Sequence, residues 1–71
     1  MKGEKTMKID VNKIKIIMAE KEMTQSQLAN SIGIGANRVS IIFKNEKASL
    51  TLIGKIAKAL NVKVEHIVIP E

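Results

Sequence analysis

The residues with the most distinctive chemistry are gathered between positions 36 and 44. If this segment is a helix, Val39, Ile42 and Phe43 share its inward face. The outward face then presents amide, guanidinium, hydroxyl and ammonium groups together with one large apolar side chain. Such a surface can read base edges in DNA, because amides and guanidinium groups pair with adenine and guanine while apolar side chains contact thymine methyls.

Several residues on this outward face have competing interpretations. Ile41 is either a further core residue or a contact for a thymine methyl. Asn37 has the amide geometry for the N6/N7 edge of adenine, and its position near the start of the helix favours that role over a simple surface role. Arg38 lies beside the stripe and can reach either a guanine or a phosphate. The residues that we predict to read bases are Ala36, Asn37, Arg38, Ser40 and Ile41.

The elements before this segment carry clear local signals. Thr24 and Gln27 form a T-x-x-Q capping box, in which each side chain accepts from the backbone N–H of the other residue. Gly33 can adopt the left-handed conformation that ends a helix, and only two residues separate it from the next helical pattern. The spacing therefore predicts a helix-turn-helix whose second helix, residues 36–44, enters the major groove.

The remaining pattern is helical as well. Apolar spacing predicts a helix from residue 11 to about Lys21 and another over residues 50–60, capped by Ser49. Residues 64–68 predict one more short turn, and 44–48 predict a polar loop. We find no convincing strand pattern, so the expected fold is all-α, with five helices. Gly54, inside the fourth helix, suggests close packing at that point because glycine lowers helix propensity.

Length and composition limit the alternatives. The chain has 71 residues, a net charge of +5, 45% hydrophobic residues and no cysteine. This predicts one small domain and excludes thiolate zinc sites and cysteine nucleophiles. His66 is the only histidine, so we expect no enzymatic activity, no metal and no cofactor. No apolar run reaches the roughly 18 residues of a membrane span, and no signal-peptide core is present, which predicts a cytoplasmic protein.

The motif over residues 23–40, MTQSQLANSIGIGANRVS, resembles the phage repressor/Cro helix-turn-helix family, and the lambda repressor DNA-binding domain in particular. The resemblance continues through KIAKALNV at residues 55–62 and EHI at residues 65–67, so that it covers roughly residues 11–68. It implies a sequence-specific regulator of transcription, of repressor type, that binds double-stranded DNA. Antitoxins share this fold, so a protein whose main partner is a toxin is the alternative.

The sequence departs from the family pattern at several positions. Many members have an interior arginine–glutamate pair, where this chain has Met18 and Phe43. Replacing a buried ion pair by apolar side chains is often neutral or stabilising, so the same fold is expected. Asn45 occupies the position of the usual glycine after the recognition helix, and Ala48 the position of a common proline.

A second set of residues is predicted to bind phosphates. Gln25 begins a helix, where the backbone N–H groups and the helix dipole favour anions, and the Gly35 amide offers the same chemistry at the next helix. Lys44, Asn45 and Lys47 flank the recognition helix. Lys55, Lys58 and Lys63 are expected to form a solvated face.

The two ends of the chain carry the remaining predictions. Residues 1–8 are expected to be a flexible basic arm, with residues 9–71 forming the helix-turn-helix domain. The lysines at positions 2, 5 and 8 either reach the DNA or serve as a solubilising tail. Ile67, Val68 and Ile69 predict a homodimer through the C-terminal segment, which would match a palindromic operator.

Overall fold

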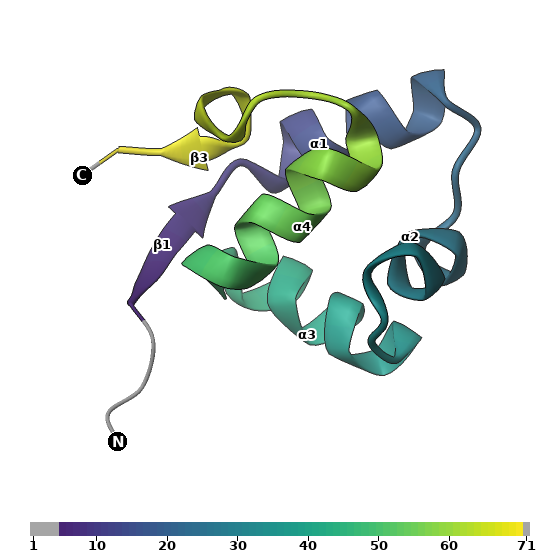
Figure 1. Ribbon diagram of the computed structural model, residues 1–71, viewed down its shortest axis with the longest axis horizontal. Coiled ribbons are helices and arrows are strands. Elements are labelled where there is room, and N and C mark those ends of the chain that lie inside the picture. Colours follow the sequence, from purple (N-terminus) through teal and green to yellow (C-terminus); the bar gives the residue numbers. More distant parts are fainter. Residues whose placement is uncertain (1–4, 71) are drawn as a thin grey trace.

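The computed structural model describes residues 5–70 and consists of helices packed beside a small sheet (Figure 1). Helix α4 lies at the centre, with α2 and α3 on one side and strands β1 and β3 on the other. In chain order the elements are β1 (Thr6–Ile9), α1 (Val11–Glu20), α2 (Gln25–Ile32), α3 (Ala36–Asn45), β2 (Lys47–Ser49), α4 (Leu50–Leu60), a 3-10 turn (Val64–His66) and β3 (Val68–Ile69).

Short polar side chains fix where the helices begin. Asp10 and Ser49 cap α1 and α4 by accepting from the backbone N–H three residues further on, at 3.0 and 3.3 Å. The predicted capping box is confirmed: Gln27 N–H donates to the Thr24 hydroxyl at 3.0 Å, and Thr24 N–H donates to the Gln27 side chain at 2.9 Å. Gly33 ends α2 in the left-handed conformation at φ 78°, also as predicted.

The core is entirely apolar among the residues that the structure describes. Every helix contributes to it, and its fully buried members include Ile14, Leu28, Ile53 and Leu60. Met18 and Phe43 are both buried in the same cluster, as expected for apolar side chains at positions where relatives have an ion pair. No polar or charged residue between positions 5 and 70 is buried.

The prediction of an all-α fold with five helices is confirmed only in part: the fold is mostly helical and contains the helix-turn-helix at α2 and α3, but the number of helices and the expectation of no strand are wrong. Between residues 5 and 70 the protein has four α-helices and a three-stranded antiparallel sheet in the order β2-β1-β3. Met7 lies opposite Ala48, and Ile9 lies opposite Val68. These strands have two to four residues, too few for an alternating pattern to be recognised, and they pair segments that are far apart in the sequence.

The prediction of a flexible arm over residues 1–8 is wrong from residue 6 onward, where the chain forms a strand. Thr6–Ile9 is the central strand, with Ile9 buried and Met7 packed against the core. The exposed Lys8 therefore lies on a strand paired on both sides. The part of the predicted arm that includes Lys2 lies outside the described residues.

The end of the recognition helix differs from the prediction by one to two residues. Helix α3 continues through Asn45, and Glu46, not Asn45, adopts the left-handed conformation at φ 57°. The expected polar loop over residues 44–48 is thus the last turn of α3, this single turn residue and the start of β2. Ala48 is buried, which explains an apolar residue in this predicted loop segment.

The C-terminal segment closes over the core. The fifth helix predicted over residues 64–68 is a 3-10 turn followed by β3. Ile67 is 0% exposed, whereas Ile69 is 37% exposed. None of the helices between residues 5 and 70 has the length and apolar character that a membrane span requires.

Gly54 does not mark a close approach between helices. A Cβ at Gly54 would have no atom within 4 Å apart from its chain neighbours and the backbone of its own helix. The packing that we expected from this glycine is therefore not present.

Candidate nucleic-acid interface

Helix α3 is oriented by three buried side chains on one face. Val39, Ile42 and Phe43 pack into the core, and their spacing of three and four residues places the other residues toward solvent. The predicted base-reading residues Ala36, Asn37, Arg38, Ser40 and Ile41 are all exposed. The structure therefore brings the whole predicted set together on one accessible helix.

Ile41 was the ambiguous member of this set. Its side chain is 55% exposed, so the interpretation of Ile41 as a core residue is wrong. A large aliphatic side chain left in water between polar neighbours is available for an apolar contact with a partner.

The first residue of α2 is connected directly to α3. The Ser40 hydroxyl donates a hydrogen bond to Oε1 of Gln25 at 3.2 Å. This bond occupies the carbonyl of the Gln25 amide and leaves its NH₂ group as the outward donor. The sequence does not predict this contact, because Gln25 and Ser40 are fifteen positions apart and no short-range pattern links them.

The starts of α2 and α3 also present free backbone N–H donors, in addition to the Gln25 side chain. A helix leaves the N–H groups of its first residues without acceptors inside the helix, and for α2 these include Gln25 and Ser26. Helix α3 begins after Gly35, which makes no side-chain capping bond. Gly35 has φ −75° and open space around its Cβ position, so neither backbone strain nor packing requires a glycine here.

The C-terminal end of α3 carries the remaining predicted phosphate-binding residues, two lysines and one asparagine. Lys44, Asn45 and Lys47 are exposed, on either side of the turn that joins α3 to β2. Glu46 lies within this group and is also exposed. Glu46 could not be predicted at this turn from the sequence, because its left-handed backbone conformation is typical of glycine or asparagine.

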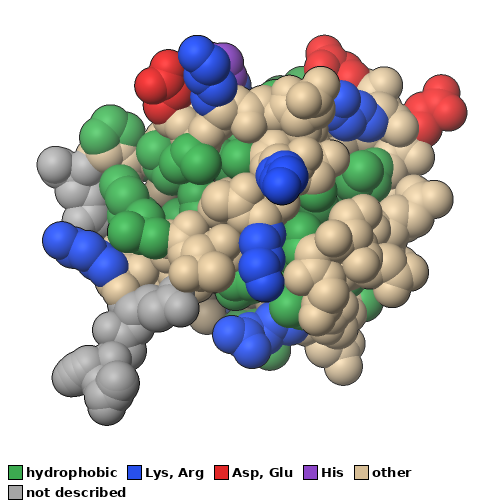
Figure 2. Space-filling model, viewed as in Figure 1, with side chains coloured by type: hydrophobic (Ala, Val, Ile, Leu, Met, Phe, Trp, Pro, Cys, Tyr) green, Lys and Arg blue, Asp and Glu red, His purple; other side chains and the backbone are tan. Residues whose placement is uncertain are grey.

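The charges are unevenly distributed over the surface (Figure 2). On the face shown, Lys and Arg side chains are seen at the upper edge, at the left, in the middle and at the lower edge, where α3 lies, whereas acidic side chains are seen only at the upper edge. Such a distribution favours an anionic partner on the side of α3. Among residues 5–70, no three His, Asp or Glu side chains come together in an arrangement that could hold a metal ion.

The fold and the exposed second helix of a helix-turn-helix define a class of DNA-binding protein. Residues 13–71 match the family model described as the Cro/C1-type HTH DNA-binding domain, and the chain belongs to that family. The resemblance to phage repressors is thereby confirmed, and with it the class of partner, double-stranded DNA.

Two solved structures are similar over almost the whole chain. A protein from Bacteroides fragilis, described as a candidate DNA-binding protein, is 27% identical with a TM-score of 0.68, covering 92% of this chain and 100% of the other. The transcriptional regulator VanUg is 25% identical with a TM-score of 0.71, covering 100% of this chain and 97% of the other. None of the curated proteins matches the sequence.

Proposed function

We propose that the protein is a sequence-specific regulator of transcription, acting as a repressor, that inserts α3 into the major groove. The observation that carries this proposal is the exposed face of α3, which combines hydrogen-bonding groups with an apolar side chain while its opposite face is buried. The similarity to the transcriptional regulator VanUg supports the regulatory role.

We assign base reading to Ala36, Asn37, Arg38, Ser40 and Ile41. Asn37 pairs with adenine, and the methyl groups of Ala36 and Ile41 face thymine methyls. Arg38 reaches a guanine or a neighbouring phosphate. Ser40 directs its proton to Gln25, and its oxygen lone pairs remain available for a base amino group.

We assign phosphate binding to Gln25, Gly35, Lys44, Asn45 and Lys47. Gln25 presents its NH₂ group beside the free N–H groups at the start of α2. Gly35 directly precedes α3, next to the free N–H groups at the start of that helix. Lys44, Asn45 and Lys47 are exposed at the other end of α3, so phosphates on both sides of the groove can be held. These contacts orient the helix without reading sequence.

The decisive experiment is selection of bound sequences from random duplex DNA. We expect enrichment of a short motif, repeated as a palindrome with half-site centres about one helical turn apart. A motif in a single copy would support sequence-specific binding without a two-fold dimer. If no motif is enriched although the protein is folded, the proposed function is wrong and the antitoxin alternative gains support.

We also propose a homodimer through the C-terminal segment. Val64 and Ile69 are exposed on either side of the buried Ile67, and β3 lies at an edge of the sheet. Apolar side chains beside an open strand edge favour association of two copies. Sedimentation of the protein with and without its selected DNA tests this, because a 1:1 complex on a palindromic site would contradict it.

A further inference from the structure

The outer face of the sheet brings together two lysines that are far apart in the sequence. Ile9 and Ala48 are buried, and side chains alternate between the two faces of a strand. Lys8 and Lys47 therefore lie on the opposite face, toward solvent, and both are exposed. They are direct partners in the register of β1 and β2, so the two ammonium groups belong to adjacent positions on one surface.

The hydrogen bonds around this pair define its spacing. The Ile9 N–H donates to the carbonyl of Glu46 at 3.0 Å, which joins the residue after Lys8 to the residue before Lys47. The two lysines are therefore a non-hydrogen-bonded pair, the closer of the two arrangements in an antiparallel sheet, with Cα atoms about 4.5 Å apart. Like charges directly opposite one another in this way destabilise a sheet.

No residue of the three strands neutralises the pair, because β1, β2 and β3 contain neither Asp nor Glu. Two carboxylates are close in sequence but lie outside the strands. Asp10 accepts from the backbone N–H of Lys13 as the cap of α1, and Glu46 occupies the turn between α3 and β2. The sheet itself thus places two like charges side by side, an arrangement that favours an anion bound between them.

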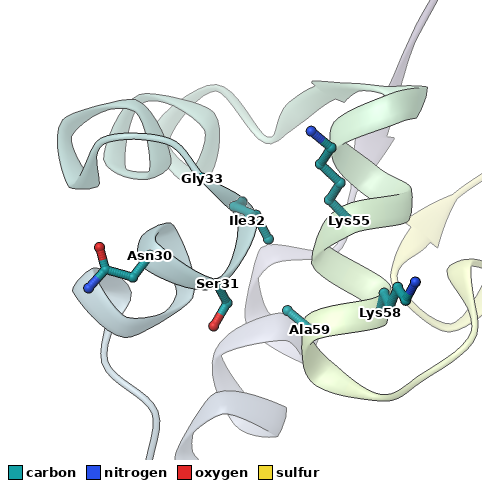
Figure 3. Close-up of a pocket in the computed structure, with 7 residues that line it drawn as sticks. All are labelled: Asn30, Ser31, Ile32, Gly33, Lys55, Lys58 and Ala59. Atoms are coloured by element: carbon teal, nitrogen blue, oxygen red, sulfur yellow. The ribbon is translucent and has the colours of Figure 1, made fainter.

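A second pair of neighbouring lysines has a different geometry. Lys55 and Lys58 are both exposed and lie three residues apart on α4, beside a shallow groove between α2 and α4 (Figure 3). Figure 3 shows their ammonium groups directed away from one another. These two side chains therefore do not converge on one anion, and they provide a matched control for the pair on the sheet.

The pair on the sheet is continuous with the proposed DNA contacts at the end of α3. Lys44 and Asn45 end that helix, one turn residue follows, and Lys47 begins β2. Lys8 is thus fixed beside a residue already proposed to bind phosphate. The chain belongs to a DNA-binding family, and backbone phosphates dominate the charge of DNA. A DNA phosphate is therefore the anion that this position favours.

We propose that Lys8 and Lys47 together hold one phosphate of the DNA backbone. This inference rests on the proposed function and adds the sheet to the surface that binds DNA. The shared phosphate removes the repulsion between the two ammonium groups, so bound DNA strengthens the pairing of β1 with β2.

The test is the salt dependence of affinity for the selected site and for random duplex DNA, measured by fluorescence anisotropy for Lys8→Gln, Lys47→Gln and the double variant. The slope of log affinity against log salt falls by about 0.9 for each phosphate contact that is lost. A shared phosphate predicts a fall of about one unit in the double variant and less than that in each single variant. The affinity of the double variant should fall about threefold or more on both DNAs.

Thermal unfolding without DNA at low ionic strength gives an independent measurement. Each single substitution removes the repulsion and should raise the unfolding temperature by about 1–4 °C, and the double variant should gain little more. The matched control, Lys55→Gln/Lys58→Gln, makes the same change in charge. Any effects of its two substitutions on DNA affinity should be additive, because these ammonium groups diverge.

Several results would overturn the proposal. An unchanged salt slope in the double variant, while the native protein binds DNA, would exclude the pair from the interface and leave the proposed function intact. A fall of about two units would mean two separate phosphates. Displacement of DNA by inorganic phosphate at constant ionic strength, in the native protein but not in the double variant, would make the pair a site for free phosphate. If the native protein binds no duplex DNA, the proposed function fails together with this inference.

Discussion

The helix-turn-helix and the sheet are stabilised by contacts of very different range. In α2 and α3 the capping box joins residues three positions apart, and the turn depends on one left-handed glycine. In the sheet, Thr6–Ile9 pairs with Lys47–Ser49 and with Val68–Ile69. The recognition helix is therefore defined within one short segment, whereas the sheet forms only when three distant parts of the chain meet.

The sheet nevertheless supports the recognition helix at one point. The Ile9 N–H donates to the carbonyl of Glu46 at 3.0 Å, and the Leu50 N–H donates to the carbonyl of Lys5 at 3.1 Å. These bonds hold β1 along the connection between α3 and α4. The Asp10 N–H donates to the carbonyl of Ile67 at 2.8 Å, which ties the C-terminal segment to the same strand. Loss of the sheet would therefore loosen the end of α3.

The largest expected effect is a loss of stability from a substitution in the C-terminal segment that joins the sheet. Ile67→Ala removes a fully buried side chain and should lower the free energy of unfolding by about 2–5 kcal/mol, because it creates a cavity in the core. Ile69→Ala is the comparison variant: at protein concentrations too low for dimerisation it should lower stability by less than about 1 kcal/mol, since that side chain is 37% exposed. Urea unfolding of both variants measures the difference.

The same pair of variants separates core packing from dimerisation. The loss in Ile67→Ala should not depend on protein concentration, because the side chain packs inside its own protomer. If Ile69→Ala is the more destabilised variant, and increasingly so on dilution, the C-terminal segment contributes chiefly through a second copy.

The local character of the helix-turn-helix explains what the sequence could predict. The capping box, the turn at Gly33 and the buried stripe of Val39, Ile42 and Phe43 are all visible as short-range patterns, and they placed the exposed face of α3 correctly. The strands could not be recognised, because their stability comes from pairing and not from intrinsic propensity. The Gln25–Ser40 bond could not be predicted either, since it depends on how two helices cross.

A variant on the recognition helix should lower DNA affinity and leave stability almost unchanged, which is the opposite of the effect expected for Ile67→Ala. Asn37→Ala should reduce affinity for the selected site by about 1–3 kcal/mol and relax the preference at one base pair. Its stability should change little, because Asn37 is exposed. Binding to the selected site and to random duplex DNA is compared by competition. A parallel loss on both would make Asn37 a positioning residue.

The contact between α2 and α3 should have a smaller effect on binding. Ser40→Ala removes the donor to Gln25, so the Gln25 amide would no longer be held in the orientation that we propose for phosphate binding. A double-mutant cycle with Gln25→Ala should give a coupling energy of about 0.5–1.5 kcal/mol in DNA affinity, the range of a single hydrogen bond. The loss from Gln25→Ala should be similar on the selected site and on random DNA. Additive losses in the cycle would show that the bond does not contribute to binding.

The smallest expected effect concerns α4, which lies between the two regions. Gly54 is inside this helix, and a Cβ there would meet no atom within 4 Å beyond its chain neighbours and the helix's own backbone. Gly54→Ala should therefore raise the free energy of unfolding by about 0.5–1 kcal/mol, since alanine has the higher helix propensity and restricts the unfolded chain. Gly33→Ala is the matched control. It should destabilise the protein, because Gly33 has φ 78°, a conformation that disfavours alanine. DNA affinity should be unchanged in Gly54→Ala, since the substitution lies in neither proposed set of DNA contacts. A loss of stability in Gly54→Ala would mean that α4 packs more closely against its neighbours than the space around this residue indicates.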